Sequence, residues 1–105
     1  KNINENFRKP YIPKDYESSW AQFSLLAKDK DHKMKTMRKM AKEGIPTMIY
    51  YKTPLHLQKC FKGLKYKLGN FPVAERVSEL IFSIPMHPYL EKRDQDLIIK
   101  ALNRF

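Results

Sequence analysis

The apolar residues of this chain come in short blocks with two alternating spacings, and this alternation limits the folds open to the chain. Three blocks are rich in β-branched and aromatic residues, which predicts strands at residues 20–28, 45–51 and 80–85. After each block, apolar residues recur every three or four positions, as they do on one face of a helix. The order strand, helix, strand, helix, strand, helix predicts a small α+β structure, with a sheet of about three strands and helices packed on one face.

The first helix is expected between an acidic cap and a glycine. Asp29 or Asp31 can accept the free backbone N–H groups of its first turn, and Gly44 suits the left-handed turn that often follows a helix. Apolar residues three or four positions apart along this helix favour a stripe facing the core, made of Met34, Met37 and Ala41 with Met40 at its edge.

Prolines set the limits of the later helices. Thr53-Pro54 ends the second predicted strand. Residues 55–61 then predict a short helix with three side chains turned inward, Leu55, Cys60 and Phe61. Pro72 fits the first turn of the next helix, where its missing N–H has no helical partner to lose. The last helix is expected within residues 91–105, with an apolar face made of Leu97, Ile98, Ala101, Leu102 and Phe105.

At 105 residues the chain is long enough for one domain with a modest core. Residues 1–18 hold two prolines and no sustained apolar period, which is typical of an irregular lead-in or linker. The folded domain is therefore expected over residues 19–105. The first residue is Lys1 rather than methionine, so we expect that the chain was processed or cut from a longer protein.

The formal net charge of +10 admits a stand-alone basic module that binds RNA or another polyanion, because lysines displace counterions from phosphate backbones. The basic residues are scattered, however, and are interleaved with acids after residue 74, as on a solvated surface. The sequence also lacks the Gly- and aromatic-rich strand pattern of an RNA-recognition motif. Polyanion binding is therefore the alternative hypothesis.

No apolar run approaches the roughly 20 residues of a membrane helix, and the N-terminal residues lack the apolar centre of a signal peptide. We therefore expect a cytoplasmic protein with no membrane partner. Cys60 is the single cysteine, which excludes an internal disulfide and a zinc cluster built from thiols. The three histidines are spaced too irregularly to predict a metal site.

The sequence contains no phosphate-binding loop, no HExxH helix and no Gly-x-Ser-x-Gly elbow, so no catalytic machinery is visible. Two stretches, TPLHLQ (residues 53–58) and PMHPYL (residues 85–90), place a histidine beside a proline-fixed turn, where loops tend to carry function. His87 is expected to be a structural turn residue. For His56 the residue types leave two interpretations open, a satisfied turn residue and a ligand-binding residue.

Four stretches taken together resemble the C-terminal part of the DegT/DnrJ/EryC1/StrS family of sugar aminotransferases: SSWAQFSLLAK, GIPTMIYYKTPLHLQKCF, NFPVAERVSELIFSIPMHPYL and DQDLIIKAL. The resemblance spans residues 10–105 in the family's order. It implies the C-terminal small domain of the aspartate-aminotransferase fold. It also implies that the larger N-terminal domain, which holds pyridoxal phosphate and the lysine of the Schiff base, is absent from this chain.

The intact enzyme implied by the resemblance moves an amino group, usually from glutamate, to a nucleotide-linked keto-sugar in polysaccharide or amino-sugar biosynthesis. Its partners are then its own large domain, a second subunit in a homodimer and the nucleotide-sugar. None of the lysines of this chain lies in a segment like the family's cofactor-lysine motif. The resemblance therefore implies that this chain alone holds no catalytic residue, binds no cofactor and is inactive.

The segment YYKTPLHLQ is the part of the resemblance that bears on substrate. In the family it approaches the sugar nucleotide, which implies that Tyr51 and His56 donate hydrogen bonds to sugar or diphosphate oxygens. Two departures stand beside this match. Lys52 and Thr53 occupy positions where a proline-rich spacer is common, and Glu91 stands where a serine cap is common, a change expected to weaken the last helix by about 1 kcal/mol.

Overall fold

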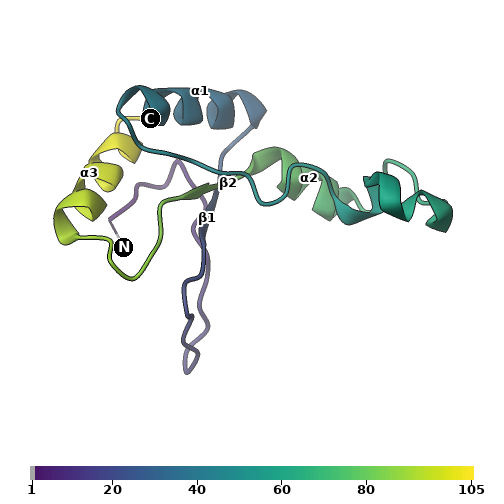
Figure 1. Cartoon of the computed structure of the whole chain (residues 1–105), viewed down its shortest axis with the longest axis horizontal. Coiled ribbons are helices and arrows are strands. Elements are labelled where there is room, and N and C mark those ends of the chain that lie inside the picture. Colours follow the sequence, from purple (N-terminus) through teal and green to yellow (C-terminus); the bar gives the residue numbers. More distant parts are fainter. Residues whose placement is uncertain (1) are drawn as a thin grey trace.

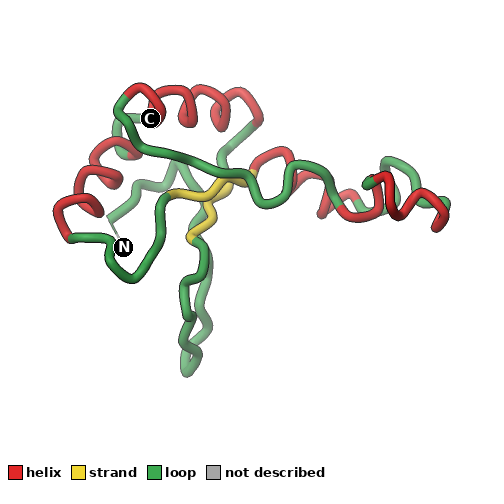
Figure 2. The backbone as a smooth tube through the Cα atoms, in the orientation of Figure 1, coloured by secondary structure: helices red, strands yellow, loops and turns green. Residues whose placement is uncertain are grey.

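Two short antiparallel strands lie at the centre of the computed structural model, which describes residues 2–105. β1 (Phe23–Leu26) pairs with β2 (Ile81–Ile84), so that Leu25 lies opposite Phe82. Both of these side chains are fully buried, and because neighbouring residues of a strand point to opposite faces, they share one face of the sheet. Figure 2 shows this pair of strands between the helices.

The predicted α+β class is confirmed. α1 (Lys30–Lys42) and α3 (Lys92–Leu102) pack with the buried face of the sheet, while α2 (Pro72–Leu80) runs directly into β2 (Figure 1). We call the sheet together with α1 and α3 the body. Its core consists of buried residues from these elements and from the segments next to them: Ile3, Phe7, Leu25, Ala27, Met40, Ile45, Phe82, Ile98, Ala101 and Leu102. Three of these residues belong to the predicted apolar face of α3: Ile98, Ala101 and Leu102.

The limits of α1 follow from local chemistry. The Asp29 carboxylate accepts a hydrogen bond from the backbone N–H of His32 at 2.7 Å, which confirms the predicted cap. Gly44 follows the helix with a φ of 73°, a left-handed conformation that glycine adopts without a Cβ clash. The buried face of the helix differs from the prediction, because Met40, which was expected at the edge of the stripe, is fully buried, whereas Met34 (38% exposed) and Ala41 are exposed.

The segment predicted as a second strand, residues 45–51, does not form one. Only Met48 pairs with the sheet, exchanging backbone hydrogen bonds of 3.0 and 2.7 Å with Ser83 of β2. Pro46 has no N–H to extend this ladder, and the chain turns at Tyr50. At the opposite edge Arg8 makes a similar bridge to Leu26, so the sheet has two strands with a one-residue bridge on each side.

Residues 2–9 contribute to the core although their backbone is irregular. Phe7 is 1% exposed and packs edge-on against Phe82, with 5.8 Å between the ring centroids. Asn6 and Asn103 tie this segment to the end of α3, through Nδ2 bonds to the carbonyls of Phe105 (2.6 Å) and Asn2 (2.9 Å). Residues 10–19 that follow are exposed throughout and form the long loop that leaves the body in Figure 1.

Residues 54–80 form a second projection, which we call the arm. It consists of two 3-10 helices, η1 (Leu55–Leu57) and η2 (Lys59–Leu64), a loop, and α2, and it points away from the body in Figure 1. Pro72 begins α2, as predicted. The expected inward-facing side chains of this segment are wrong, because Leu55 is 66% exposed, Phe61 is 40% exposed and Cys60 is exposed.

Candidate functional site

The side chain of His56 is buried at the start of the arm, in η1. Pro54 begins the short 3-10 turn that carries the histidine, and the imidazole is only 6% exposed. Its ring packs against Phe71, with 4.8 Å between the centroids. Its Nε2 atom lies 2.8 Å from Oε1 of Glu75 on α2. The ring is therefore held on two sides, by an aromatic contact and by a carboxylate.

Glu75 collects several hydrogen bonds in addition to the one from His56. Its two carboxylate oxygens accept the backbone N–H of Gly69 at 2.8 and 2.9 Å, and Oε1 also lies 3.3 Å from the N–H of Phe71. The loop before α2 and the turn that carries His56 are thus fastened to one side chain. Gly69 has a φ of 91°, which turns its N–H toward the carboxylate in a conformation that suits glycine.

The electrostatics of Glu75 follow from these contacts. Burial acts to raise the pKa of its carboxyl, but the hydrogen bonds from Gly69, His56 and Phe71, together with the charge of a protonated His56, bring the pKa below its ordinary value of 4.5. Glu75 is therefore a carboxylate at neutral pH. Because an ionised carboxylate can only accept, the His56 Nε2 atom must be the donor of their hydrogen bond.

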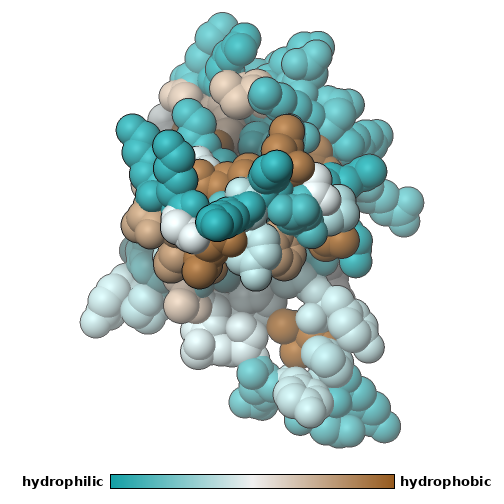
Figure 3. Space-filling model, turned by 90° about the vertical axis from the view of Figure 1, so that its right-hand side faces the viewer, coloured by the Kyte–Doolittle hydropathy of each residue, from teal (hydrophilic) through white to brown (hydrophobic). Residues whose placement is uncertain are grey.

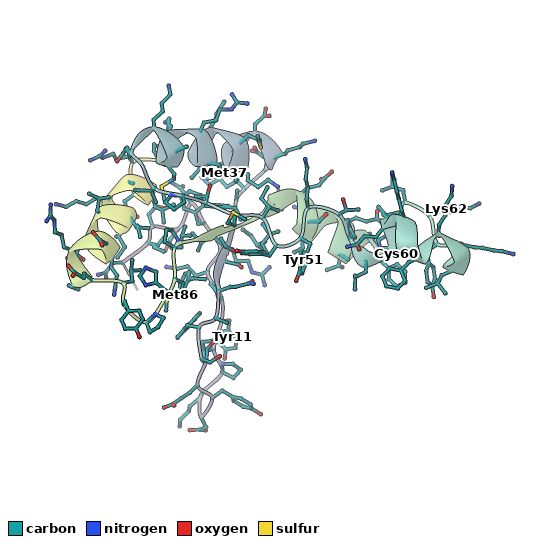
Figure 4. The ribbon with its side chains drawn as sticks, viewed as in Figure 1. Tyr11, Met37, Tyr51, Cys60, Lys62 and Met86 are labelled. Carbon is teal, nitrogen blue, oxygen red and sulfur yellow. The ribbon has the colours of Figure 1, made fainter. Side chains whose placement is uncertain are left out.

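Tyr51, the other predicted substrate contact, lies at the root of the arm and is 72% exposed (Figure 4). Its ring meets Tyr50 edge-on, with 6.3 Å between the centroids. Tyr51 and His56 line neighbouring grooves, which have Leu55 and Ala74 in common. The structure therefore places the two predicted residues on the same part of the surface without bringing them into one groove.

The arm carries an open apolar groove of about 450 Å³ beside His56. The groove is lined by side chains from η1, η2, the loop and α2: Leu55, His56, Phe61, Leu64, Tyr66, Phe71 and Ala74. Every residue from 59 to 74 is exposed, so this part of the arm has no core of its own. Figure 3 looks at the molecule from the side to which the arm points, and apolar side chains gather there with hydrophilic ones around them.

Four exposed lysines alternate in the sequence with the residues that line this groove. Lys59, Lys62, Lys65 and Lys67 are exposed, and no acidic residue occurs between residues 44 and 74. Figure 4 shows Lys62 and Cys60 toward the far end of the arm. The arm thus presents an apolar surface with a basic rim, which is suited to a partner that is apolar at the centre and acidic around it.

Among residues 2–105 the buried lysine is Lys33, which is 5% exposed. Burial lowers the pKa of its ammonium group, with a further lowering by Lys30 and Lys52 opposed by Glu79. Its Nζ donates to the carbonyl of Ser78 at 3.4 Å, in the last turn of α2. Lys33 therefore stabilises a helix end, where free carbonyls and the helix dipole favour a cation.

The remaining histidines have structural surroundings. His32 stacks on Phe7, with 4.8 Å between the centroids, and its Nδ1 accepts the N–H of Lys28 at 3.3 Å. His87 is exposed, and its carbonyl accepts the N–H of Leu90 at 3.1 Å in the turn before α3. Within residues 2–105 no group of acidic, histidine and cysteine side chains is arranged to hold a metal, and no helix is both long and apolar enough to cross a membrane.

Glu75 is the residue of this site that sequence reasoning missed. It lies in the stretch PVAERVSEL, where it looks like one more exposed acid on an amphipathic helix. The sequence signal for Glu75 is its position shortly after Gly69 and Pro72, in the first turn of the helix. A carboxylate at this position is well placed to accept backbone N–H groups from the preceding loop.

Comparisons with known proteins give a consistent result. A model of the DegT/DnrJ/EryC1/StrS aminotransferase family matches residues 1–103. The erythromycin biosynthesis sensory transduction protein EryC1 of Saccharopolyspora erythraea is 34% identical over 86 residues, which cover 82% of this chain and 23% of that protein. The UDP-2-acetamido-2-deoxy-3-oxo-D-glucuronate aminotransferase of Pseudomonas aeruginosa is 30% identical over 93 residues, which cover 89% of this chain and 24% of that enzyme.

The fold has the same neighbours. A crystal structure of a DegT DnrJ EryC1 StrS aminotransferase from Brucella abortus superposes with a TM-score of 0.84 and 37% identity, over 98% of this chain and 27% of that one. The chain thus spans about a quarter of the length of the proteins it matches.

Proposed function

Because the chain belongs to the DegT/DnrJ/EryC1/StrS aminotransferase family, whose members include nucleotide-sugar transaminases, we propose that it acts as the C-terminal small domain of such an enzyme. The proposed reaction moves an amino group, with glutamate as the donor, to the ketone of a nucleotide-linked sugar in the cytoplasm. The product is an amino sugar for a polysaccharide or a related glycan. Residues 19–105 are the proposed small domain, and the preceding residues lead into it and add Ile3 and Phe7 to its core.

The family depends on pyridoxal phosphate, which accepts and returns the amino group when it is bound. We propose that a separate, larger domain holds this cofactor and its lysine, and that this chain alone is inactive. The contact between Lys33 and the Ser78 carbonyl supports this proposal, because the buried amine of the described residues is already used within the small domain.

The observation that carries the proposal is the exposed apolar groove of the arm. An apolar surface of this kind, on a segment without a core of its own, is typical of a protein interface. We propose that the arm docks on the cofactor domain, either of its own subunit or of the second subunit of a homodimer. His56 and Tyr51, at the near end of the arm, then face the nucleotide-sugar that lies between the domains.

The roles of the two residues differ in this proposal. Tyr51 is 72% exposed and offers its hydroxyl directly to a sugar or diphosphate oxygen. Nε2 of His56 is taken by Glu75, so Nδ1 is the ring atom that remains for the ligand.

Expression of the complete reading frame that contains this chain tests the proposal. The full-length enzyme should show the visible absorbance of a cofactor bound to lysine and should form an amino sugar from glutamate and UDP-2-acetamido-2-deoxy-3-oxo-D-glucuronate, the substrate class named for the Pseudomonas relative. This chain alone should do neither. His56→Ala should raise KM about tenfold with little change in kcat, as expected for a lost ground-state contact. Stable cofactor absorbance on this chain alone would contradict the proposal.

The basic rim of the arm favours a second candidate, a stand-alone module that binds RNA or another polyanion. Lys59, Lys62, Lys65 and Lys67 lie close to aromatic side chains on which bases can stack. This candidate predicts that the chain binds single-stranded RNA with an affinity that falls steeply as salt is raised from 50 to 200 mM, and that replacing the four lysines by glutamine abolishes binding. No binding at physiological salt rejects it.

A further inference from the structure

We propose that Glu75 is a positioning residue, which holds the His56 ring by Nε2–H and so presents Nδ1 as a hydrogen-bond acceptor to a sugar hydroxyl. The inference rests on the proposed function, because it concerns the same contact between His56 and the nucleotide-sugar. It adds a residue that has no direct part in binding and it names the kind of ligand atom that His56 recognises.

The hydrogen between His56 and Glu75 is carried by the ring nitrogen Nε2. Glu75 lies 2.8 Å from Nε2 and also accepts the N–H groups of Gly69 and Phe71. Three donors around one carboxyl group stabilise its ionised form, which has no hydrogen to give. The hydrogen of the Glu75–His56 bond therefore belongs to Nε2.

Nδ1 is the ring nitrogen of His56 that makes no contact with Glu75. In a neutral imidazole with hydrogen on Nε2, Nδ1 carries a lone pair and accepts a hydrogen bond. A sugar hydroxyl can donate to it, whereas a diphosphate oxygen has no hydrogen to donate. For the neutral ring, this geometry thus favours a contact between His56 and a hydroxyl of the sugar over a contact with the diphosphate.

Glu75 also fixes the orientation of the His56 ring. Phe71 packs on the imidazole with 4.8 Å between the centroids, and Glu75 holds the loop that carries Phe71 through the N–H groups of Gly69 and Phe71 itself. The same carboxylate therefore fixes both the ring nitrogen and the aromatic neighbour. A side chain that hydrogen-bonds a binding histidine in this way sets both the tautomer and the orientation of the imidazole ring.

The direct test is a measurement on the His56 ring in this chain, labelled with ¹⁵N at histidine and studied by NMR. Since the chain has three histidines, single replacements of His32 and His87 by glutamine assign the signals. The wild-type chain should show hydrogen on Nε2 of His56, and this hydrogen should exchange with water slowly. Glu75→Ala should speed the exchange at least tenfold, since it removes a charge-assisted hydrogen bond.

Two further variants make the measurement decisive. Glu79→Ala is the matched control, because Glu79 lies one turn later on α2, is exposed, and makes no hydrogen bond to His56. It should leave the exchange unchanged. Glu75→Gln keeps the size of the side chain and a carbonyl oxygen, so the arm stays folded while the charge is lost, and exchange should again be faster than in the wild type. Equal exchange in the wild type and both Glu75 variants would overturn the inference.

A double-mutant cycle in the full-length enzyme separates this inference from the proposed function. With UDP-2-acetamido-2-deoxy-3-oxo-D-glucuronate as the probe, Glu75→Ala and His56→Ala should each raise KM, and the double variant should be no worse than His56→Ala alone. Additive effects would contradict the positioning role. If His56→Ala leaves KM unchanged while Glu75→Ala still speeds the ring exchange, the proposed function fails and the hold of Glu75 on the ring stands.

Discussion

Single side chains in this molecule show how burial sets the cost of a polar group. Lys33 and Ser83 are both buried, and each has a hydrogen-bond partner: the carbonyl of Ser78 for the Lys33 ammonium group and the Ser24 hydroxyl, at 2.8 Å, for that of Ser83. Thr36 differs, because its Oγ1 atom is buried and finds no partner among the described residues. A buried hydroxyl without a hydrogen bond reduces stability.

Thr36→Val tests this conclusion. Valine has nearly the same shape and a similar helix propensity, so the change removes the unpaired oxygen and leaves the packing in place. We expect the free energy of unfolding to rise by about 1 kcal/mol, measured by urea denaturation of this chain.

The control for this prediction is Thr36→Ala, which removes the oxygen and the methyl group together. Because it opens a small cavity, it should be less stable than the valine variant by about 1 kcal/mol. A valine variant that is less stable than the wild type would show that the Thr36 hydroxyl has a partner in solution.

His32 gives a prediction on pH. Burial lowers its pKa below the ordinary value of 6.5, assisted by Lys28 and Lys35 and opposed by Asp29. The unfolded chain therefore binds a proton at His32 more readily than the folded chain does. The free energy of unfolding should decrease as the pH falls through 6.5 toward the lower, folded pKa, with a slope of at most about 1.4 kcal/mol per pH unit.

The measurement is chemical denaturation of the wild type and of His32→Gln between about pH 7.5 and 5. The glutamine variant should lose the part of the slope that His32 supplies, while His56 and His87 remain unchanged in both proteins. Parallel curves would mean that His32 is equally easy to protonate in the folded and unfolded chain.

At the scale of elements, Asp29 rather than Asp31 caps the start of α1. Asp29 accepts the N–H of His32, whereas Asp31 lies in the first turn and acts on the helix only through its charge. Asp29→Ala should therefore lower the free energy of unfolding by about 1 kcal/mol, and Asp31→Ala, the matched control, by roughly 0.3 kcal/mol. Equal losses in thermal denaturation would contradict the assignment of the cap.

The sequence predicted those elements whose signals are local. The cap at Asp29, the glycine after α1 and Pro72 at the start of α2 depend on residues within one or two turns, and all three are found. The apolar face of α3 is found in part, because Ile98, Ala101 and Leu102 are buried whereas Leu97 is 49% exposed. Residues 45–51 failed as a strand because strand formation depends on a partner edge, and Pro46 leaves only Met48 to pair.

The candidate site was predictable in part for the same reason. The resemblance of residues 44–61 to the family drew attention to Tyr51 and His56, but Glu75 lies 19 positions beyond His56 and meets it only through the fold. The apolar side chains of the arm were misjudged too. Leu55 and Phe61 were expected inside a core, because a sequence does not distinguish residues buried in their own domain from residues that are apolar for a partner.

At the scale of the whole molecule, the chain is larger than its length predicts. Its radius of gyration is 15.5 Å and its longest dimension 48 Å, whereas a compact domain of this length has a radius of gyration of about 13 Å. Its accessible surface is 8450 Å², against roughly 6,200 Å² expected for a compact monomer of this mass. The arm and the long loop of residues 10–19 account for this shape in Figure 1.

The excess surface is the physical basis for the proposed docking of the arm. Roughly 2,000 Å² of surface beyond that of a compact monomer, shared between the arm and the loop of residues 10–19, exceeds the roughly 800 Å² that each partner buries in a standard interface. Exposed apolar side chains of the arm lie around His56, where the proposed substrate contact needs a second wall. Once the cofactor domain covers this surface, the two domains together would exclude water from the site and complete the pocket.

Hydrogen exchange of the arm tests the account most directly. Amide exchange of residues 54–80 is measured by mass spectrometry in this chain and in the full-length enzyme, with residues 92–102 of α3 as the internal reference. We expect rapid exchange of the arm amides in this chain and at least tenfold protection of them in the full-length enzyme, while α3 changes little. Equal exchange of the arm in the two proteins would contradict the claim that its apolar groove is a docking surface for the rest of the enzyme.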